Sequence, residues 1–129
     1  MSKVKSSRLS RVVPSENDEQ TKLAVWLTNK GIRFFAIPNG GYRKPMEAMR
    51  LKREGVQSGV PDLCIPIPCG AYHGLYIEMK RTKNGRVSDN QLYWLEFLRS
   101  QMYYAEVAHG CEEAKDIVTH YLSLTKPEA

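Results

Sequence analysis

The sequence predicts an α/β fold in which a mixed central sheet is flanked by helices. Three observations lead to this prediction. The chain of 129 residues suits a single domain, placed over residues 14–124, with a core of its own. Helical and strand patterns follow one another in the order helix, strand, helix, strand, strand, helix, strand, helix. The strand–helix–strand unit near the end requires a crossover, so some parallel pairing is expected.

The first half of the domain is predicted to contain two helices separated by a strand. Ser15 and Asp18 form a weaker version of the capping box, and acidic residues crowd the first turn that follows. Gly31 ends this helix. A strand rich in Ile and Phe is expected over 32–37. A proline at the first helical position then begins a second helix over 45–54.

Two strands joined by a turn are predicted in the middle of the chain. The first covers residues 62–67, where Pro66 indicates an edge or a bend. The chain turns over 69–74, and the second strand covers 75–80. Apolar and polar residues alternate along this second strand, which places the two kinds on opposite faces of the sheet. Leu75, Ile77 and Met79 form one face, and Tyr76, Glu78 and Lys80 form the other.

The last third is predicted to be a helix, a strand and a closing helix. Ser88 caps the first of these helices, with Gln91 at the reciprocal capping-box position. Hydrophobic residues at helical spacing define its buried side. They are Leu92, Leu95, Leu98 and Met102, flanked by Trp94 and Phe97. The strand is expected over 103–108 and the closing helix over 110–121, which leaves 125–129 as a tail.

The composition excludes several classes of protein. Hydrophobic residues make up 42% and charged residues 26% of the chain, which is typical of globular domains. No apolar run is long enough to cross a bilayer, and no apolar segment follows the basic first residues as in a secretory signal. The three cysteines form no C-x-x-C pair, so we expect neither disulfides nor a zinc ribbon. A reducing cytoplasm fits this cysteine usage best.

Positive charge is concentrated in the first two thirds of the chain. Residues 1–87 contain 16 Lys and Arg against 7 Asp and Glu, whereas 88–129 contain 3 against 7. The bases form three clusters: a flexible arm over 1–13, a group over 43–53 and a group over 80–86. Such clusters indicate a polyanionic partner, most often nucleic acid. From charge alone, a basic protein without such a partner is an equally open interpretation.

Asp62 and Glu78 are the candidate catalytic acids. Asp62 begins a strand directly after a Gly-Val-Pro turn, and Glu78 lies two residues before Lys80 on the next strand. If the strands pair as a hairpin, the carboxylates approach one another, and a proton or a cation must relieve their repulsion. Mg²⁺ takes such oxygen ligands, and a nearby lysine can orient water or offset phosphate charge. These two acids and the lysine suit the hydrolysis of a phosphodiester. The same spacing also occurs where an aspartate only forms a turn and a Glu-x-Lys strand only faces solvent, so that interpretation stays open.

At these residues the chain resembles a known nuclease family. Residues 59–63 (GVPDL) and 77–80 (IEMK) resemble the PD-(D/E)XK nuclease signature. Other motifs are similar to those of the virus-type replication-repair nuclease domain, VRR-NUC. They are SENDEQ at 15–20 ahead of Trp26-Leu27, IPNGG at 37–41, and SDNQ at 88–91 with Trp94-Leu95. The motifs occur in the family order over about 15–122, so the chain resembles a stand-alone, phage-like member.

The resemblance implies a restriction-endonuclease-like PD-(D/E)XK core with a metal site. Asp62 and Glu78 would bind Mg²⁺ or Mn²⁺, with the backbone carbonyl of Met79 as a further ligand. Lys80 would be the catalytic lysine, and Gln91 would match the glutamine that the family carries on the following helix. A capping box alone also explains a glutamine there, so both roles stay open for Gln91.

An acid on the first helix would complete the site. Glu16 is preferred because it lies four residues, one helical turn, before Gln20 and therefore on the same face. Glu19 is the alternative. The expected phosphate contacts come from basic side chains in two loops, which are Arg43, Lys44, Arg81 and Lys83.

The resemblance further implies a metal-dependent, structure-selective DNA endonuclease. Such an enzyme would act as a homodimer on four-way (Holliday) junctions, in the cytoplasm of a bacterial host cell if a phage encodes it. A non-catalytic, basic DNA-binding module on the same fold is one alternative, which the intact Asp62, Glu78 and Lys80 disfavour. A sequence-specific restriction-type endonuclease is another, but no long insertion is present to read bases.

Overall fold

The computed structural model of the chain describes residues 12–38 and 43–125. Within these ranges the elements follow the predicted order. They are α2 (Glu16–Asn29), β1 (Phe35–Ala36), α3 (Pro45–Arg53), β2 (Leu63–Ile65), β3 (Leu75–Lys80), α4 (Asp89–Ser100), β4 (Tyr104–His109) and α5 (Cys111–Leu122). The predicted arm over 1–13, apart from its last two residues, lies outside the described residues, as do residues 39–41 of the IPNGG loop and the tail after residue 125.

The sheet is mixed, as the sequence predicts. Its strand order is β1-β2-β3-β4, with antiparallel pairing of β1 with β2 and of β2 with β3, and parallel pairing of β3 with β4. Helix α4 makes the crossover between the two parallel strands. The pairing of β2 with β3 is the hairpin on which the approach of Asp62 to Glu78 depends.

The first two strands are shorter than predicted. Strand β1 covers two residues instead of the expected 32–37, and β2 ends at Ile65 instead of residue 67. Phe35 pairs with Cys64 in an antiparallel register, so a longer ladder would place Arg33 opposite Pro66. Proline has no N–H to donate to a ladder, and the pairing therefore stops.

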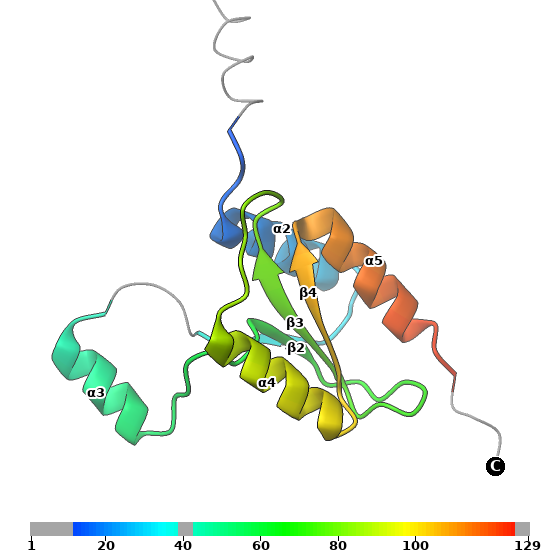
Figure 1. Ribbon diagram of the computed structural model, residues 1–129. Helices are drawn as coiled ribbons and strands as arrows, with labels where there is room; N and C mark the ends of the chain where they lie inside the picture. The colour runs from blue at the N-terminus through cyan, green and yellow to red at the C-terminus, as the bar shows by residue number, and fades with distance from the viewer. Residues whose placement is uncertain (1–11, 39–42, 126–129) are drawn as a thin grey trace, which may run out of the picture.

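The helices cover the two faces of the sheet (Figure 1). Helices α2 and α5 pack on the face that carries Leu75, Ile77 and Met79, where the larger hydrophobic core forms. Helix α4 packs on the other face, where Leu95 and Leu98 form a smaller core with Ala105, Tyr76 and Trp94. The predicted alternation along β3 is thus confirmed, and its polar face lies under α4.

The predicted apolar side of α4 is wrong in part. Leu95 and Leu98 are buried, whereas Leu92, Phe97 and Met102 are nearly half exposed. Of the predicted apolar residues of α4, Leu95 and Leu98 enter the smaller core and Trp94 packs against it. Met102 lies beyond the end of the helix in a turn, where its φ is +66°.

Helix α3 differs from the others because none of its residues is buried. It stands to one side of the sheet in Figure 1, connected by the loops before and after it. Met46 and Met49 are largely exposed, and Arg50 pairs with Glu54 within the same segment at 3.0 Å. Among the helices of residues 12–38 and 43–125, none combines the length and the apolarity that a membrane crossing requires.

Candidate active site

Asp62 lies immediately before β2, and its carboxylate is held against β3. Its Oδ2 accepts a hydrogen bond of 2.7 Å from the backbone N–H of Met79, the residue between Glu78 and Lys80. The preceding turn packs closely against the start of α4. A Cβ at Gly59 would lie 2.6 Å from the main-chain carbonyl of Asn90, and the φ of Gly59 is +91°. Only glycine satisfies both conditions, which accounts for its place in the GVPD motif.

Glu78 and Lys80 are buried side by side on the α4 face of β3. Their side chains are 3% and 5% exposed, and Nζ of Lys80 lies 3.8 Å from Oε2 of Glu78. Among the described residues, Glu19 is the only other charged residue that is buried. Burial of charged groups is unfavourable, and a partner offsets this cost only in part. Glu78 and Lys80 therefore lower the stability of the fold.

Gln91 joins the two buried side chains from the first turn of α4. Its Oε1 accepts from Nζ of Lys80 at 2.9 Å and from the backbone N–H of Ser88 at 2.9 Å. Its Nε2 donates to Oε2 of Glu78 at 3.2 Å. Both partners of Oε1 are obligate donors, which fixes the orientation of the amide. The capping box is also complete, so one side chain both caps α4 and contacts the candidate site.

The two candidate acids influence each other strongly. The pKa of Glu78 is raised to about 9, and burial is the largest cause. The charge of Asp62 and a hydrogen bond between the two carboxyl groups contribute to this rise, while Lys80 opposes it. One lysine therefore does not balance the two carboxylates. In the absence of another cation, the carboxyl group of Glu78 holds a proton at neutral pH.

This donor set fits a hard divalent cation. Asp62 and Glu78 offer carboxylate oxygens, and Met79, which follows Glu78 in β3 and donates its N–H to Asp62, offers a main-chain carbonyl. The described part of the chain contains no group of three or more His, Cys, Asp or Glu arranged to hold a metal ion. Two carboxylates with water and substrate oxygens are the usual surroundings of Mg²⁺, which retains several waters. Mn²⁺ prefers similar oxygen ligands.

The two candidate acids of α2 have different surroundings. Glu16 is exposed, and its charge is the smallest of the causes that raise the pKa of Glu78. Glu19 is buried, and its Oε1 accepts a hydrogen bond of 3.1 Å from the backbone N–H of Cys111. The carboxylate of Glu19 therefore already has a hydrogen-bond partner at the N-terminus of α5.

The sequence contains a signal for the position of Glu19. It lies four and eight residues before Leu23 and Leu27, so it shares the buried face of α2. Helix α5 begins at Gly110, which has no side chain to cap the first turn. A helix without its own cap takes an acceptor from elsewhere, and Glu19 supplies it across 92 positions of sequence.

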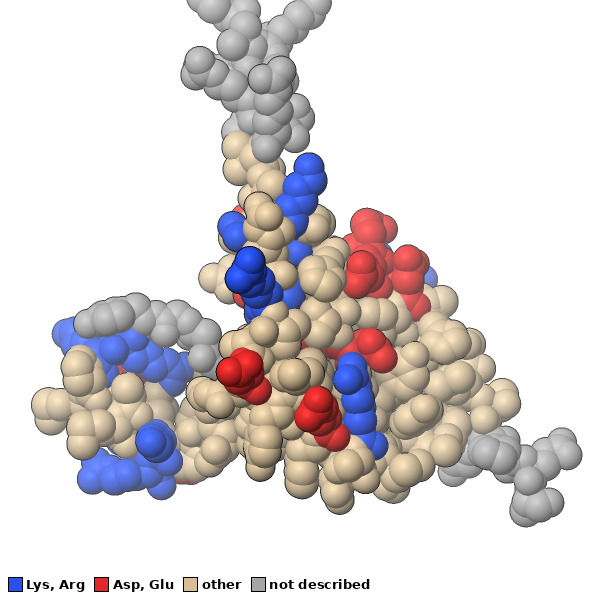
Figure 2. Space-filling model, in the orientation of Figure 1, with Lys and Arg blue, Asp and Glu red and all other residues tan. Residues whose placement is uncertain are grey.

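The four candidate phosphate contacts lie in two separate loops. Arg43 and Lys44 precede α3, and Nη2 of Arg43 donates to the carbonyl of Pro38 at 2.6 Å. Arg81 and Lys83 are exposed in the loop after β3. Figure 2 shows basic side chains over α3 and near the loop above β3, with acidic side chains over the start of α5. The structure thus places bases before and along α3 and in the loop that follows β3, the strand that carries Glu78.

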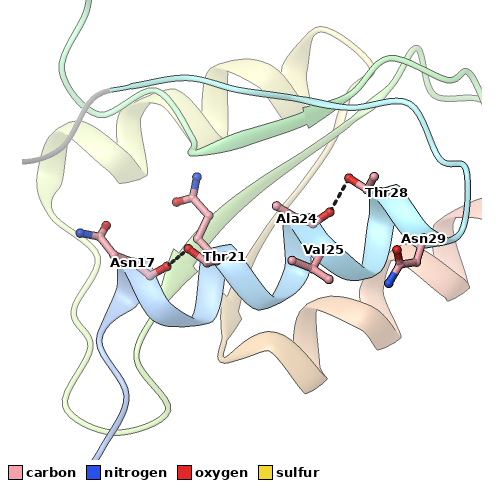
Figure 3. Close-up of a pocket in the computed structure, with 7 residues that line it drawn as sticks. Asn17, Thr21, Ala24, Val25, Thr28 and Asn29 are labelled. Carbon is pink, nitrogen blue, oxygen red and sulfur yellow. Dashed lines mark hydrogen bonds between the residues drawn. The ribbon is translucent and has the colours of Figure 1, made fainter.

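A hollow of about 560 Å³ runs along α2, and none of the described residues that line it is charged (Figure 3). The hydroxyls of Thr21 and Thr28 donate to the backbone carbonyls of Asn17 and Ala24 at 2.8 Å. These hydroxyls are already satisfied, and the hollow has no titratable group. We therefore assign the chemistry to the corner of β3 and α4.

Comparisons with known proteins agree with this geometry. The family described as the VRR-NUC domain matches residues 14–112 of the chain. A solved structure described as a "VRR_NUC domain protein" superimposes with a TM-score of 0.77 and 31% sequence identity, covering 88% of this chain and 92% of that chain. No curated protein matches. With its mixed sheet, its flanking helices and this family match over most of its length, the chain belongs to the VRR-NUC family and has a nuclease-type, PD-(D/E)XK-like core.

Proposed function

We propose that the protein is a Mg²⁺- or Mn²⁺-dependent endodeoxyribonuclease that acts on branched DNA. The observation that supports this most directly is the partly buried network of Asp62, Glu78, Lys80 and Gln91. A protein that only binds DNA gains nothing from two carboxylates facing a phosphate backbone. The pair also weakens the fold, so its presence favours a catalytic role.

Each residue of the network has a proposed task. Asp62 and Glu78 would hold the divalent cation together with the carbonyl of Met79. Once bound, the cation supplies positive charge near the scissile phosphate and lowers the pKa of water. Lys80 orients the attacking water or offsets charge on the phosphate, and Gln91 fixes the position of the Lys80 ammonium group. Glu16 would bind water at the edge of the site.

We further propose that the active form is a homodimer that cuts four-way junctions. Cutting two strands of a junction symmetrically requires two sites related by a two-fold axis. A dimer would also double the basic surface over α3 and the loop after β3. Light scattering of the protein alone and with a junction would report the stoichiometry. A monomer on the junction that still cuts both strands would contradict the dimer.

The decisive experiment compares cutting of a labelled four-way junction with cutting of a matching linear duplex. Each is incubated with Mg²⁺, Mn²⁺ or EDTA, using the wild type, Asp62→Asn and the control Asp116→Asn. Asp116 is exposed on α5 and undergoes the same chemical change away from the site. We expect cutting only with metal, a preference for the junction, and loss of activity only in Asp62→Asn.

Three outcomes would contradict the proposal. Cutting in EDTA, or an Asp62→Asn variant as active as the wild type, would exclude the metal site described here. Binding of the junction without cutting in either metal would instead favour the non-catalytic DNA-binding module.

A further inference from the structure

A groove between α3 and the start of α4 adjoins the candidate active site. Its volume is about 650 Å³, and its lining includes Arg43 and Lys52 on one side and Tyr93 and Trp94 on the other. No residue that lines it is acidic. Helix α3 buries none of its own residues, so the side chains that it contributes to the groove are accessible.

The groove and the active site share a wall. Ser58 and Asn90 line the groove, and Nδ2 of Asn90 donates to Oγ of Ser58 at 2.9 Å. Asn90 immediately precedes Gln91, which contacts Glu78 and Lys80. Ser58 lies four residues before Asp62 in the same loop. The groove is therefore close enough to the carboxylate pair to receive nucleotides that neighbour a phosphate bound there.

The lining has the chemistry of a site for unpaired nucleotides. Tyr93 is 65% exposed, so its ring has a free face. Trp94 is half-buried and packs edge-to-face on Tyr93, with ring centroids 6.2 Å apart, which holds the tyrosine ring in place. Single-stranded nucleic acid is bound by aromatic rings that stack on bases and by cations that contact the backbone. Lys52 and Arg43 supply those cations.

We propose that this groove holds unpaired nucleotides of a branched DNA substrate next to the cut, with a base stacked on Tyr93. The proposal rests on the proposed function and names the feature of the branch that the enzyme recognises. A continuous, fully paired duplex keeps its bases stacked inside the helix and offers none to Tyr93, whereas a four-way junction, whose arms are also paired, would offer one by opening a base pair at the point where the strands cross. Selectivity for branched DNA then arises from α3 and α4, while the chemistry stays at β3.

The test is a binding titration with a DNA duplex that carries a short single-stranded branch containing 2-aminopurine, whose fluorescence is quenched when it stacks. Every protein also carries Asp62→Asn, so that cutting does not consume the probe. Tyr93→Ala is compared with Phe97→Ala, because Phe97 is an exposed ring of the same helix that does not line the groove. Lys52→Gln is compared in the same way with Lys30→Gln, an exposed lysine at the end of α2 that lies outside the groove and outside the three basic clusters.

We expect Tyr93→Ala to lose the quenching and to bind the branched probe roughly tenfold more weakly. Its affinity for a fully paired duplex should stay the same. Lys52→Gln should weaken binding of the branched probe a few-fold, and both controls should stay within twofold of the parent. Thermal unfolding of each variant checks that the fold is retained.

Failure of this proposal is distinguishable from failure of the proposed function. If Tyr93→Ala binds and quenches like its parent, or weakens binding of duplex and branched probe equally, the groove does not hold unpaired bases, whatever the nuclease assay shows. If quenching depends on Tyr93 but the chain with Asp62 intact never cuts, the groove holds unpaired DNA and the nuclease proposal fails.

Discussion

Two neighbouring regions of this domain differ in how far their charged side chains are buried. Where β3 meets α4, Glu78 and Lys80 are buried, hydrogen-bonded and close to other charges. Helix α3 precedes Asp62 by a short stretch of chain. Its residues are exposed except for the half-buried Leu51, and its last turn is basic. Fixed geometry suits a reaction, whereas an exposed basic helix suits a DNA surface whose shape varies. The difference predicts which substitutions affect chemistry and which affect binding.

The largest effect is expected for Lys80→Met. Methionine fills the same volume without a charge, and Glu78 can remain protonated beside it. We expect cutting to fall by about a hundredfold or more, with the fold retained. Single-turnover cutting of saturating junction measures the loss. Lys83→Met, an exposed lysine of the following loop, is the control and should change cutting only a few-fold. Equal losses in both variants would contradict a catalytic role for Lys80.

The next effect separates the two roles of Gln91. Gln91→Ala removes the partner that holds Lys80 and Glu78, so we expect roughly tenfold to hundredfold slower cutting. Ser88→Ala removes the capping hydroxyl, which accepts from the N–H of Gln91 at 3.2 Å, but leaves the Gln91 amide. Ser88→Ala should lower the free energy of unfolding by about 1 kcal/mol and should change the rate of cutting little. If the two variants lose activity in parallel, Gln91 acts only as a cap.

A third pair contrasts the two acids of α2. Glu19→Ala leaves the N–H of Cys111 without its acceptor in a buried place, so we expect a loss of about 1–3 kcal/mol in the free energy of unfolding. Glu19→Gln keeps an acceptor and should lose less. Glu16 is exposed, so Glu16→Gln should leave stability unchanged and slow cutting. Urea unfolding and the junction assay together test this, and a stable but inactive Glu19→Ala would reverse the assignment.

The pH dependence of stability tests the carboxylate pair. In the folded protein the pKa of Glu78 is raised to about 9, chiefly by burial and then by Asp62. The native state therefore binds this proton more tightly than the unfolded chain does. The stabilisation is complete below the unfolded pKa and is lost as the pH rises toward 9.

We expect the melting temperature of the metal-free protein to fall between about pH 5 and pH 9. Asp62→Asn keeps an acceptor for the N–H of Met79 and removes the repulsion, so it should flatten this fall. Mg²⁺ or Mn²⁺ should raise the melting temperature more at pH 8 than at pH 5, because binding requires ionised carboxylates. A metal effect that does not depend on pH would contradict the site.

The smallest effect is expected on the exposed helix. Met46 on α3 is 84% exposed, so Met46→Ala should change the free energy of unfolding by less than about 0.5 kcal/mol. Leu95→Ala on α4, which is 2% exposed, should lower it by about 2–5 kcal/mol. Urea denaturation measures both. Similar losses would show that α3 is part of the stable core and would remove the contrast between the two regions.

Much of the architecture follows from local features of the sequence. The capping boxes at Ser15 and Ser88 define where α2 and α4 begin, and both are formed. The alternation along β3 separates core residues from Glu78 and Lys80 because side chains of a strand point to opposite faces. The crossover at α4 dictates the parallel pairing of β3 with β4, since a short turn cannot connect parallel strands.

Only the tertiary structure decided how distant segments meet. The length of β1 depends on Pro66 in the opposite strand, and the exposure of Leu92 depends on how α4 lies on the sheet. The placement of Glu19 at α5 and the effect of Glu16 on Glu78 depend on packing between segments 92 and 62 positions apart in the sequence. Spacing along a helix identifies a face but not its neighbour, because contacts between distant segments are set by the whole core.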